Sequence, residues 1–321
     1  MIRLTWRQAR PAFVTCAAIL LAFTAFAVYT EREMSSYIAA NGLATCTGGE
    51  SVCGVLGDAF KSKFGGVLAV SQFIGFVPVL VGAFWGAPLI AREIESGTHR
   101  MVWTQSVGRV RWLSVKAGTF LLAAAVVSAI LTWLMTWWLH PLRYVQGGGT
   151  VGPSAGDRIS PNVFSFMGIA PVAYTLFAFC VGAAAGAVIK KVVPAMVTAI
   201  VLYVPPRIIM AKSVRATVIT PEKVSFPAGT PSPRTGMGDW ILSNRLVDAA
   251  GHPLNVDYQT MSAACQKTMG PSCYPAGARF VDTYQSLARF WPLQFIEAGV
   301  FVGLGALCLA FTIWWTMRRV S

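Results

Sequence analysis

Four long stretches of this chain contain no Asp, Glu, Lys, Arg or His, and they restrict what the chain can fold into. They cover residues 11–30, 65–90, 117–139 and 159–189. Each reaches the length of about 20 residues that an α-helix needs to cross about 30 Å of hydrocarbon. Charged types make up 12% of the 321 residues, about half of the fraction in a soluble domain. The sequence therefore predicts a polytopic membrane protein.

Two further spans complete the prediction. Residues 192–206 are apolar and end in a Pro-Pro pair, and residues 290–317 are apolar apart from one acid, Glu297. We therefore expect an all-α protein with six transmembrane helices. The expected parts are residues 1–206 with five spans, residues 207–289 as a large extracellular region or small domain, and residues 290–321 with the sixth span and its tail.

The first ten residues place Trp6 among Arg3, Arg7 and Arg10. Tryptophan beside arginine is typical of the membrane interface, so we expect a short interfacial helix on the inner surface. A basic flank with one aromatic anchor is the alternative. The apolar core of the first span is too long for a cleaved signal peptide, and no small-x-small cleavage site follows it. We therefore expect the first helix to be retained.

The distribution of basic residues predicts the orientation. Twelve of the 26 Lys and Arg residues lie in residues 1–10, 91–116, 190–191 and 317–321. An excess of Lys and Arg is typical of cytoplasmic segments, so we expect a cell-membrane protein with both termini in the cytoplasm. This rule and contact with anionic membrane lipid also account for the net charge of +13. Nucleic acid is therefore not an expected partner.

Four cysteines fall in predicted outer segments. Cys46 and Cys53 lie in a polar stretch, residues 31–64, that we expect to be an outer loop, and Cys265 and Cys273 lie in the extracellular region. Two close pairs in an oxidising compartment predict two local disulfides. Connectivity across the two segments and metal binding are the alternatives. Metal sites usually have closer spacing and more ligands, so we expect no metal.

Prolines and glycines inside the spans predict local departures from a straight helix. Pro78 and Pro88 lie in the second span, where they are expected to cause kinks. Gly182 and Gly186 are four residues apart in the fourth span, and this spacing favours close contact with another helix.

Several kinds of enzyme chemistry are not expected. The dipeptide Gly-Lys does not occur, so the chain lacks the G-x-x-x-x-G-K-[ST] phosphate loop. His99, His140 and His252 lie far apart in the sequence, which argues against haem or zinc chemistry in the membrane. We therefore expect no catalytic residues and no cofactor in this chain.

Glu297 is the one clear intramembrane acid, and Gln294 precedes it by three residues, so the two lie on one side of the helix. A carboxylate costs about 2.5 kcal/mol or more at the membrane centre, so it is expected to face protein or water. Two interpretations follow. Glu297 contacts a substrate or a proton, or it forms a structural ion pair with Arg207 or Arg289 at the outer boundary.

Residues 91–116 form a polar, basic segment between two uncharged spans. A loop that only joins two helices needs about two to eight residues, so this segment is expected to contact a partner. Ile94, Thr98 and Met101 have helical spacing, which predicts a short amphipathic helix on the inner surface that Gly97 ends or turns. The alternative is a solvated loop whose acids balance its own arginines.

The pattern E-x-E-x-G-T at residues 93–98 resembles the E-x-x-G-T signature of ABC-2-type export permeases. The segments from Trp103 to Trp112 and from Arg289 to Glu297 resemble a subgroup common in actinobacteria. The resemblance covers essentially the whole chain. In these permeases the signature marks a coupling helix, which docks into a separate ATPase subunit.

The resemblance implies the permease subunit of an ATP-binding-cassette exporter. Two cytosolic ATPase subunits would bind ATP and Mg²⁺, and a second permease copy or a similar chain would complete the pathway within membrane lipid. Carboxylates would form charge-assisted hydrogen bonds to basic groups of the ATPase. The cargo is expected to be amphipathic or hydrophobic: an antibiotic, a peptide or a lipid. The residues expected at the coupling site are Glu93, Ile94, Glu95, Gly97, Thr98, His99 and Met101.

Two rival functions stay open from the sequence. A proton-coupled secondary transporter would use Glu297 as its proton site and would work without an ATPase. A membrane sensor or assembly protein would bind an extracellular ligand through residues 207–289.

Overall fold

The computed structural model describes residues 2–45, 49–97, 109–144, 158–159, 161–230, 232, 239–255 and 273–319. Within these residues, six helical stretches are long and apolar enough to cross a membrane, and the predicted number of spans is confirmed. The six candidate spans are Arg10–Ala40, Val77–Glu95, Arg111–Leu142, Ala170–Ile189, Val192–Thr217 and Leu287–Arg318.

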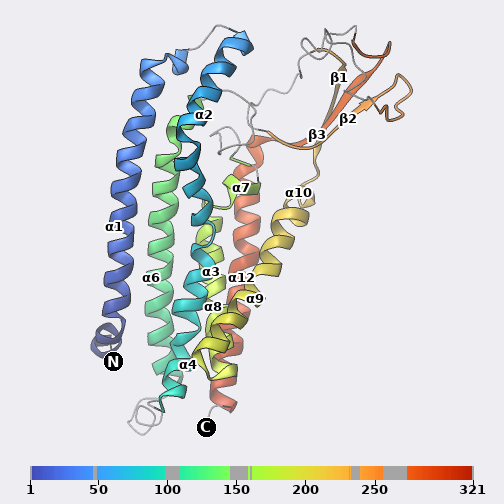
Figure 1. Ribbon diagram of the computed structural model, residues 1–321. Coiled ribbons are helices and arrows are strands. Elements are labelled where there is room, and N and C mark those ends of the chain that lie inside the picture. The colour runs from blue at the N-terminus through green and yellow to red at the C-terminus, as the bar shows by residue number, and fades with distance from the viewer. Residues whose placement is uncertain are drawn as a thin grey trace.

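The first two long helices form a hairpin with a short connection (Figure 1). They are α1 (Ile2–Ala40) and α2 (Gly49–Ile74), with a 3-10 turn at Leu43–Thr45 between them. The prediction of a loop at residues 31–64 is therefore wrong, because residues 31–40 and 49–64 are helical. This stretch is polar on one side only, and its other side packs Tyr37 against Phe60 and Phe64, with ring centroids 5.9 and 5.6 Å apart. Two amphipathic helices explain why this stretch is both polar in sequence and regular in structure.

The second span is interrupted at both of its prolines. It consists of α3 (Val77–Val81), a π-helical turn called η2 (Gly82–Gly86) and α4 (Pro88–Glu95). Pro78 and Pro88 each lie in the first turn of a new helical piece, because proline has no N–H to donate to the preceding turn. The kinks predicted in this span are confirmed.

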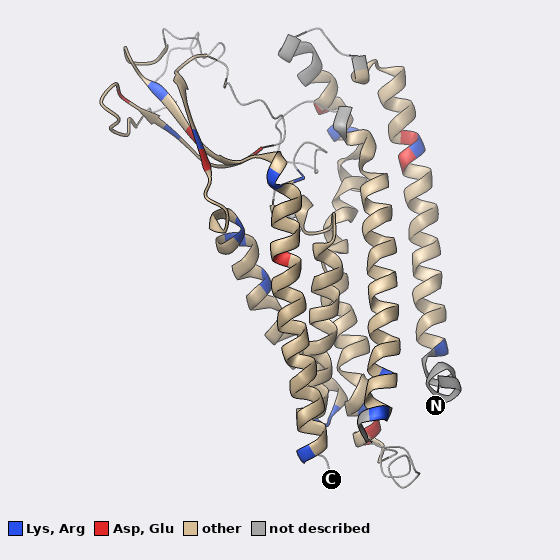
Figure 2. Cartoon of the chain, turned by 180° about the vertical axis from the view of Figure 1, so that it is seen from behind, with Lys and Arg blue, Asp and Glu red and all other residues tan. Residues whose placement is uncertain are grey.

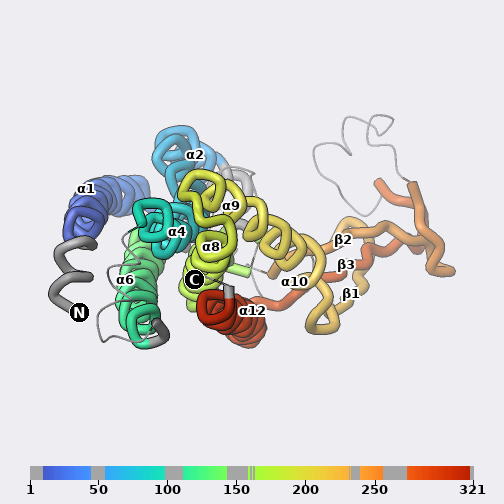
Figure 3. The backbone as a smooth tube through the Cα atoms, turned by 90° about the horizontal axis from the view of Figure 1, so that it is seen from below, coloured from blue at the N-terminus to red at the C-terminus, as the bar shows by residue number. Residues whose placement is uncertain are grey.

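One helix lies at the centre of the bundle, as the view along the helices shows (Figure 3). This central helix is α8 (Ala170–Ile189), which contacts α3, η2, α4, α6, α9 and α12. Before it in the chain come α6 (Arg109–Trp138), the 3-10 turn η3 (His140–Tyr144) and the short α7 (Pro161–Phe164). In the apolar stretch of α8 72% of the residues are buried, against 6% in α1. The α1 helix is therefore peripheral.

The fifth span extends beyond the boundary expected at residue 206. It is built from α9 (Val192–Ile209), a second π-helical turn η5 (Met210–Val214) and α10 (Arg215–Thr217). Pro205 and Pro206 lie inside α9 and do not end it. Each proline removes one backbone hydrogen bond, and membrane helices tolerate this loss where neighbouring groups and local π adjustments compensate. Arg207 and Arg215 are therefore parts of a membrane helix.

The region between spans five and six contains a small antiparallel sheet, so the all-α expectation is wrong there. Its strands are β1 (Glu222–Pro227), β2 (Trp240–Val247) and β3 (Arg279–Gln285), in the order β1-β3-β2. β3 leads through the 3-10 turn η7 (Leu287–Arg289) into α12 (Phe290–Arg319). Gln285 joins the sheet to the bundle, since its amide donates to the carbonyls of Ala216 and Ile219 at 3.1 and 2.6 Å.

Both ends of the chain lie at the same end of the bundle as α4, and the sheet lies at the opposite end (Figure 1). Figure 2 shows basic residues on the last turn of α12 and the first turns of α6 at the α4 end. The described parts of the segments predicted to be cytoplasmic thus lie at one end of the bundle. The lead residues are helical and continuous with α1, and their position on a membrane surface stays a prediction.

The cysteines of the spans are free thiols: Cys16, Cys180 and Cys308. Cys273 is disulfide-bonded. Cys46 and Cys265 lie outside the described residues, and so does the side chain of Cys53. The two predicted pairings therefore stay predictions.

Candidate functional site

The carboxyl end of α4 carries the two acids of the E-x-E-x-G-T pattern, and they have different surroundings. Glu93 is buried, and its Oε1 accepts a hydrogen bond from the Lys116 ammonium on α6 at 2.6 Å. The Lys116 ammonium also lies 5.2 Å from the ring centre of Trp112. Glu93 is thus held inside the protein, in an ion pair with a base of its own segment.

Glu95, in contrast, is exposed, and it contacts the start of α9. Its Oε2 accepts a hydrogen bond from the backbone N–H of Val192 at 2.9 Å. The N-cap residue of α9, Lys191, contributes no side-chain hydrogen bond. The first N–H groups of a helix lack intrahelical partners and carry partial positive charge. The Glu95 carboxylate therefore caps α9 from α4.

The other expected coupling residues are distributed as follows. Ile94 is partly buried and packs against the cluster formed by α4, α6 and α8. Gly97 is exposed, with a φ of +73° that favours glycine. It follows α4, which ends at Glu95; the amphipathic helix predicted from Ile94, Thr98 and Met101 extends into residues outside the described part and stays a prediction. Thr98, His99 and Met101 lie outside the described residues.

Four glycines let the second span touch α8 through the backbone. A Cβ added to Gly182 would meet the carbonyl oxygen of Gly82 inside 3.0 Å, and one added to Gly186 would meet that of Ala87. The relation is mutual, since a Cβ at Gly82 would lie 2.6 Å from the Ala178 carbonyl oxygen. A Cβ at Gly86 would likewise meet the carbonyl oxygen of Phe179 inside 3.0 Å. The close contact predicted for Gly182 and Gly186 is thus present, and its partners are η2 for Gly182 and the start of α4 for Gly186.

These contacts join the second span to three other helices. Its α4 end is paired with α6 through Glu93, with α9 through Glu95, and with α8 through the glycines. Packed interfaces of this kind deform little and move as units. We call the unit of η2, α4 and α8 the glycine block.

A second polar cluster lies inside the opposite half of the bundle. Glu297 on α12 is 2% exposed, and Arg215 holds its carboxylate with Nε–Oε2 and Nη2–Oε1 distances of 2.9 and 2.8 Å. Tyr174 on α8 donates to Oε1 at 2.5 Å, and Arg207 Nη1 lies 3.5 Å from the same oxygen. We call these four residues the Glu297 cluster.

The sequence missed the principal partner of Glu297. Arg215 lies within residues 207–289, the region predicted to be extracellular, because the expected fifth span ends at residue 206. Arg207 is a weaker partner, and Arg289 pairs with Glu222 at 2.8 Å. The eight-residue spacing of Arg207 and Arg215 is helical, and with hindsight it is the signal that both lie on one face.

Gln294 has a structural role that the sequence did not reveal. Its side chain is fully buried, and its Oε1 accepts from the N–H of Ala170 at 2.8 Å. Its Nε2 donates to the carbonyls of Met167 and Phe164 at 3.0 and 3.3 Å. The amide of Gln294 therefore satisfies the backbone of the connection between α7 and α8.

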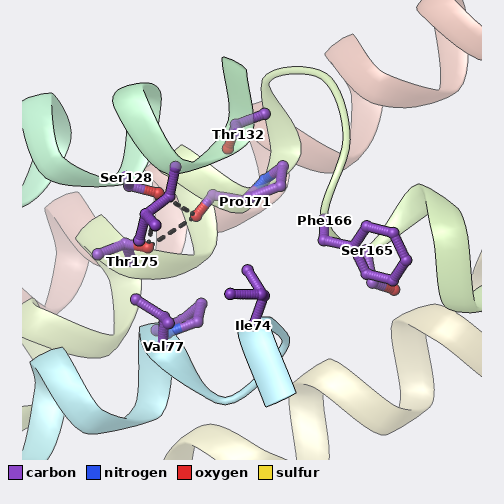
Figure 4. A pocket seen from close by; sticks show the side chains of 10 residues that line it. Ile74, Val77, Ser128, Thr132, Ser165, Phe166, Pro171 and Thr175 are labelled. Atoms are coloured by element: carbon purple, nitrogen blue, oxygen red, sulfur yellow. Dashed lines mark hydrogen bonds between the residues drawn. The ribbon is translucent and has the colours of Figure 1, made fainter. Parts of the chain in front are cut away.

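Two cavities differ in size and position. Between α3, α6 and α8 lies a cavity of about 10 Å³, where the hydroxyls of Ser128 and Thr175 bond to each other at 3.0 Å and to the Pro171 carbonyl (Figure 4). This volume suits about one water. A groove of about 520 Å³ lies between α1, the second span and α6, with apolar walls. That volume is in the range of small-molecule sites. Its walls include Ile19, Phe23, Leu80, Phe84, Trp85 and Leu131.

A family model described as ABC-2 membrane transporter related matches residues 17–215. The chain belongs to this family. The match extends from α1 to the start of α10 and includes the glycine block, Tyr174 and both arginines of the Glu297 cluster. ABC-2 membership indicates an ABC transporter permease, a transmembrane component that is generally not catalytic itself and that works with an ABC ATPase subunit. Comparisons with curated proteins and with solved structures found no match.

Proposed function

We propose that this chain is the permease subunit of an ABC exporter and that the carboxyl end of α4 docks onto a cytosolic ATPase. The observation that carries the proposal is the connection of this end, which bears the E-x-E-x-G-T pattern, to α6, α8 and α9. A displacement of the end of α4 would be transmitted to α8 at the centre of the bundle through these contacts. The ATPase subunits, two per assembly, would bind ATP and Mg²⁺.

The proposal places the α4 end in the cytoplasm. The end of the bundle that carries α4 also carries both ends of the chain (Figure 1). Lys190, Lys191 and Arg318 add positive charge near it, which agrees with the rule that cytoplasmic segments are rich in Lys and Arg. The sheet and the disulfide-bonded Cys273 would then face the outside, where disulfides persist.

A second copy of the permease, or a similar chain, would complete the transport pathway. The centre of a single chain is filled by α8, and the cavity between α3, α6 and α8 has room for about one water. A pathway for cargo therefore requires another surface. Nucleotide-driven closure of the ATPase would move the glycine block as a rigid body, and the helix break before Pro78 would be the hinge.

The groove between α1, the second span and α6 supports an amphipathic or hydrophobic cargo. Ile19, Leu80 and Phe84 on its walls are all exposed at the surface of the bundle. A molecule in the membrane would reach them without crossing water. Antibiotics, peptides and lipids with an apolar part fit this description.

The rival that uses Glu297 as a proton site is not favoured. Both oxygens of this carboxylate are bonded to a guanidinium, and Oε1 also accepts from Tyr174. A proton carrier must exchange its proton with water or with another carrier in each cycle, and this carboxylate is 2% exposed and enclosed by Arg215 and Tyr174. The sensor rival has no observation in its favour among the described residues.

Glu95→Ala in the assembled complex is expected to reduce ATP hydrolysis stimulated by the permease by about fivefold, the low end of usual coupling energies. The change removes both a docking carboxylate and the cap of α9. The measurement is the ATPase rate of the complex purified through the permease, at equal permease content.

Asp58→Ala is the matched control. Asp58 is an exposed acid on α2, 78% accessible and 3.6 Å from Lys61, so its loss is expected to leave the rate unchanged. Equal stimulation by wild type, Glu95→Ala and the Glu93→Gln/Glu95→Ala double variant would contradict the docking proposal.

A further inference from the structure

The Glu297 cluster contains more positive than negative charge. Arg215 occupies both oxygens of Glu297 in a two-bond fork, the strongest arrangement for this pair. Arg207 is a second guanidinium for the same carboxylate. Among the described residues, no other acid forms an ion pair with Arg207. The cluster therefore has a net charge of +1.

The excess charge lies inside the membrane region. Arg207 is fifteen residues from the start of α9, which corresponds to about 22 Å from the α4 end. The neighbouring side chains on α9 are apolar, and Ile208 and Ile209 are exposed. A cation at such a position is costly unless an anion accompanies it.

Arg207 is also the accessible member of the cluster. Its side chain is 16% exposed, against 0% for Arg215 and 3% for Glu297. The ring of Tyr174 supports one face of the guanidinium, 4.0 Å from its carbon. This contact fixes the plane of the guanidinium. Nη1 faces Glu297 at 3.5 Å, and the Tyr203 side chain is a further hydrogen-bond partner, so a ligand would use the remaining N–H groups on the exposed side.

We infer that Arg207 binds the anionic headgroup, phosphate or carboxylate, of an amphipathic molecule in the half of the membrane near the sheet. Glu297 and Arg215 form the fixed support, and Arg207 supplies the donors. The binding site itself does not depend on the proposed function, but the identification of the molecule as cargo rests on it. A resident anionic phospholipid has the same chemistry and is the other source.

The test uses the full chain in phosphatidylcholine nanodiscs and an alkyl phosphate with a fluorescent tail as the probe. Wild type is expected to bind it saturably, and Arg207→Gln about tenfold more weakly, the effect of one charge-assisted hydrogen bond. Lys212→Gln removes an exposed base of the same helix and is expected to bind like wild type. The alcohol with the same tail and inorganic phosphate are expected to compete poorly.

Adding phosphatidylglycerol to the nanodiscs distinguishes the sources. Weaker probe binding indicates a resident lipid, and unchanged binding indicates a cargo site; both support the headgroup assignment. Arg207→Gln is expected to melt no lower than wild type, because it removes an excess charge. Equal probe binding by Arg207→Gln and wild type, equal competition by the alcohol or by inorganic phosphate, or a lower melting temperature with unchanged binding would overturn the inference. A failed Glu95→Ala experiment would leave it standing.

Discussion

Gly182→Ala is expected to destabilise the purified chain by about 3 kcal/mol, the upper range for overpacking. The new methyl group would overlap the carbonyl oxygen of Gly82 and lie 2.8 Å from the backbone nitrogen of Ala87. Backbone atoms cannot turn away as the end of a flexible side chain can, so η2 and α8 would have to separate. The measurement is the apparent melting temperature in detergent, followed by tryptophan fluorescence.

Gly303→Ala on α12 is the matched control for this change. A Cβ at Gly303 meets nothing within 4 Å, and alanine is favoured over glycine in a helix by about 0.5–1 kcal/mol. This variant is therefore expected to melt at or above the wild-type temperature. If Gly182→Ala also melted at or above the wild-type temperature, η2 and α8 would not be in direct backbone contact at Gly182.

Glu297→Met is expected to cost about 3–5 kcal/mol, the usual range when one partner of a buried ion pair is removed. The change leaves two guanidinium groups without their carboxylate, and Arg215 is 1% exposed. It also removes the acceptor of the Tyr174 hydroxyl. The melting temperature and the yield of folded chain from membranes measure the effect.

The double variant Arg215→Met/Glu297→Met separates charge from packing. It restores the wild-type net charge of the cluster, since Arg207 stays and one ion pair is lost as a whole. Replacing a buried pair by apolar groups is often close to neutral, so the double variant is expected to be more stable than Glu297→Met. A double variant as unstable as the sum of the two single changes would show that the residues do not act as a pair.

The spans were predictable where apolar residues form an uninterrupted run. The central helix α8 follows this rule, and the last span α12 follows it apart from Glu297. The outer half of α1 does not, because Arg32 and Glu33 are exposed while Met34 is buried in the core cluster of the bundle. A window that averages hydropathy cannot distinguish such a helix from a polar loop. The Pro205-Pro206 pair is a second source of error. It predicts the end of the fifth span, but α9 continues through both prolines into the π-helical turn η5.

The candidate site was predictable in its residue types and less so in its contacts. The sequence identifies the segment that bears Glu93 and Glu95, but it does not predict which groups the two carboxylates contact. Lys116 is 23 residues from Glu93, and the N-terminus of α9 is farther still. Both contacts depend on tertiary packing. Gly82 and Gly86 repeat the spacing of Gly182 and Gly186, and matching the two pairs would have identified the glycine block.

We expect the carboxyl end of α4 to face the cytoplasm and to contact an ATPase. Ser96 is exposed directly after α4, so Ser96→Cys can be introduced into a chain in which the free cysteines of the described residues, Cys16, Cys180 and Cys308, are replaced by alanine. A membrane-impermeant maleimide is expected to label position 96 in inside-out vesicles and not in intact cells. A short maleimide–benzophenone reagent, attached to position 96 through its maleimide, is expected to photo-crosslink it to the co-purifying ATPase. Labelling from outside the cell, or no crosslink while the ATPase co-purifies, would contradict the account.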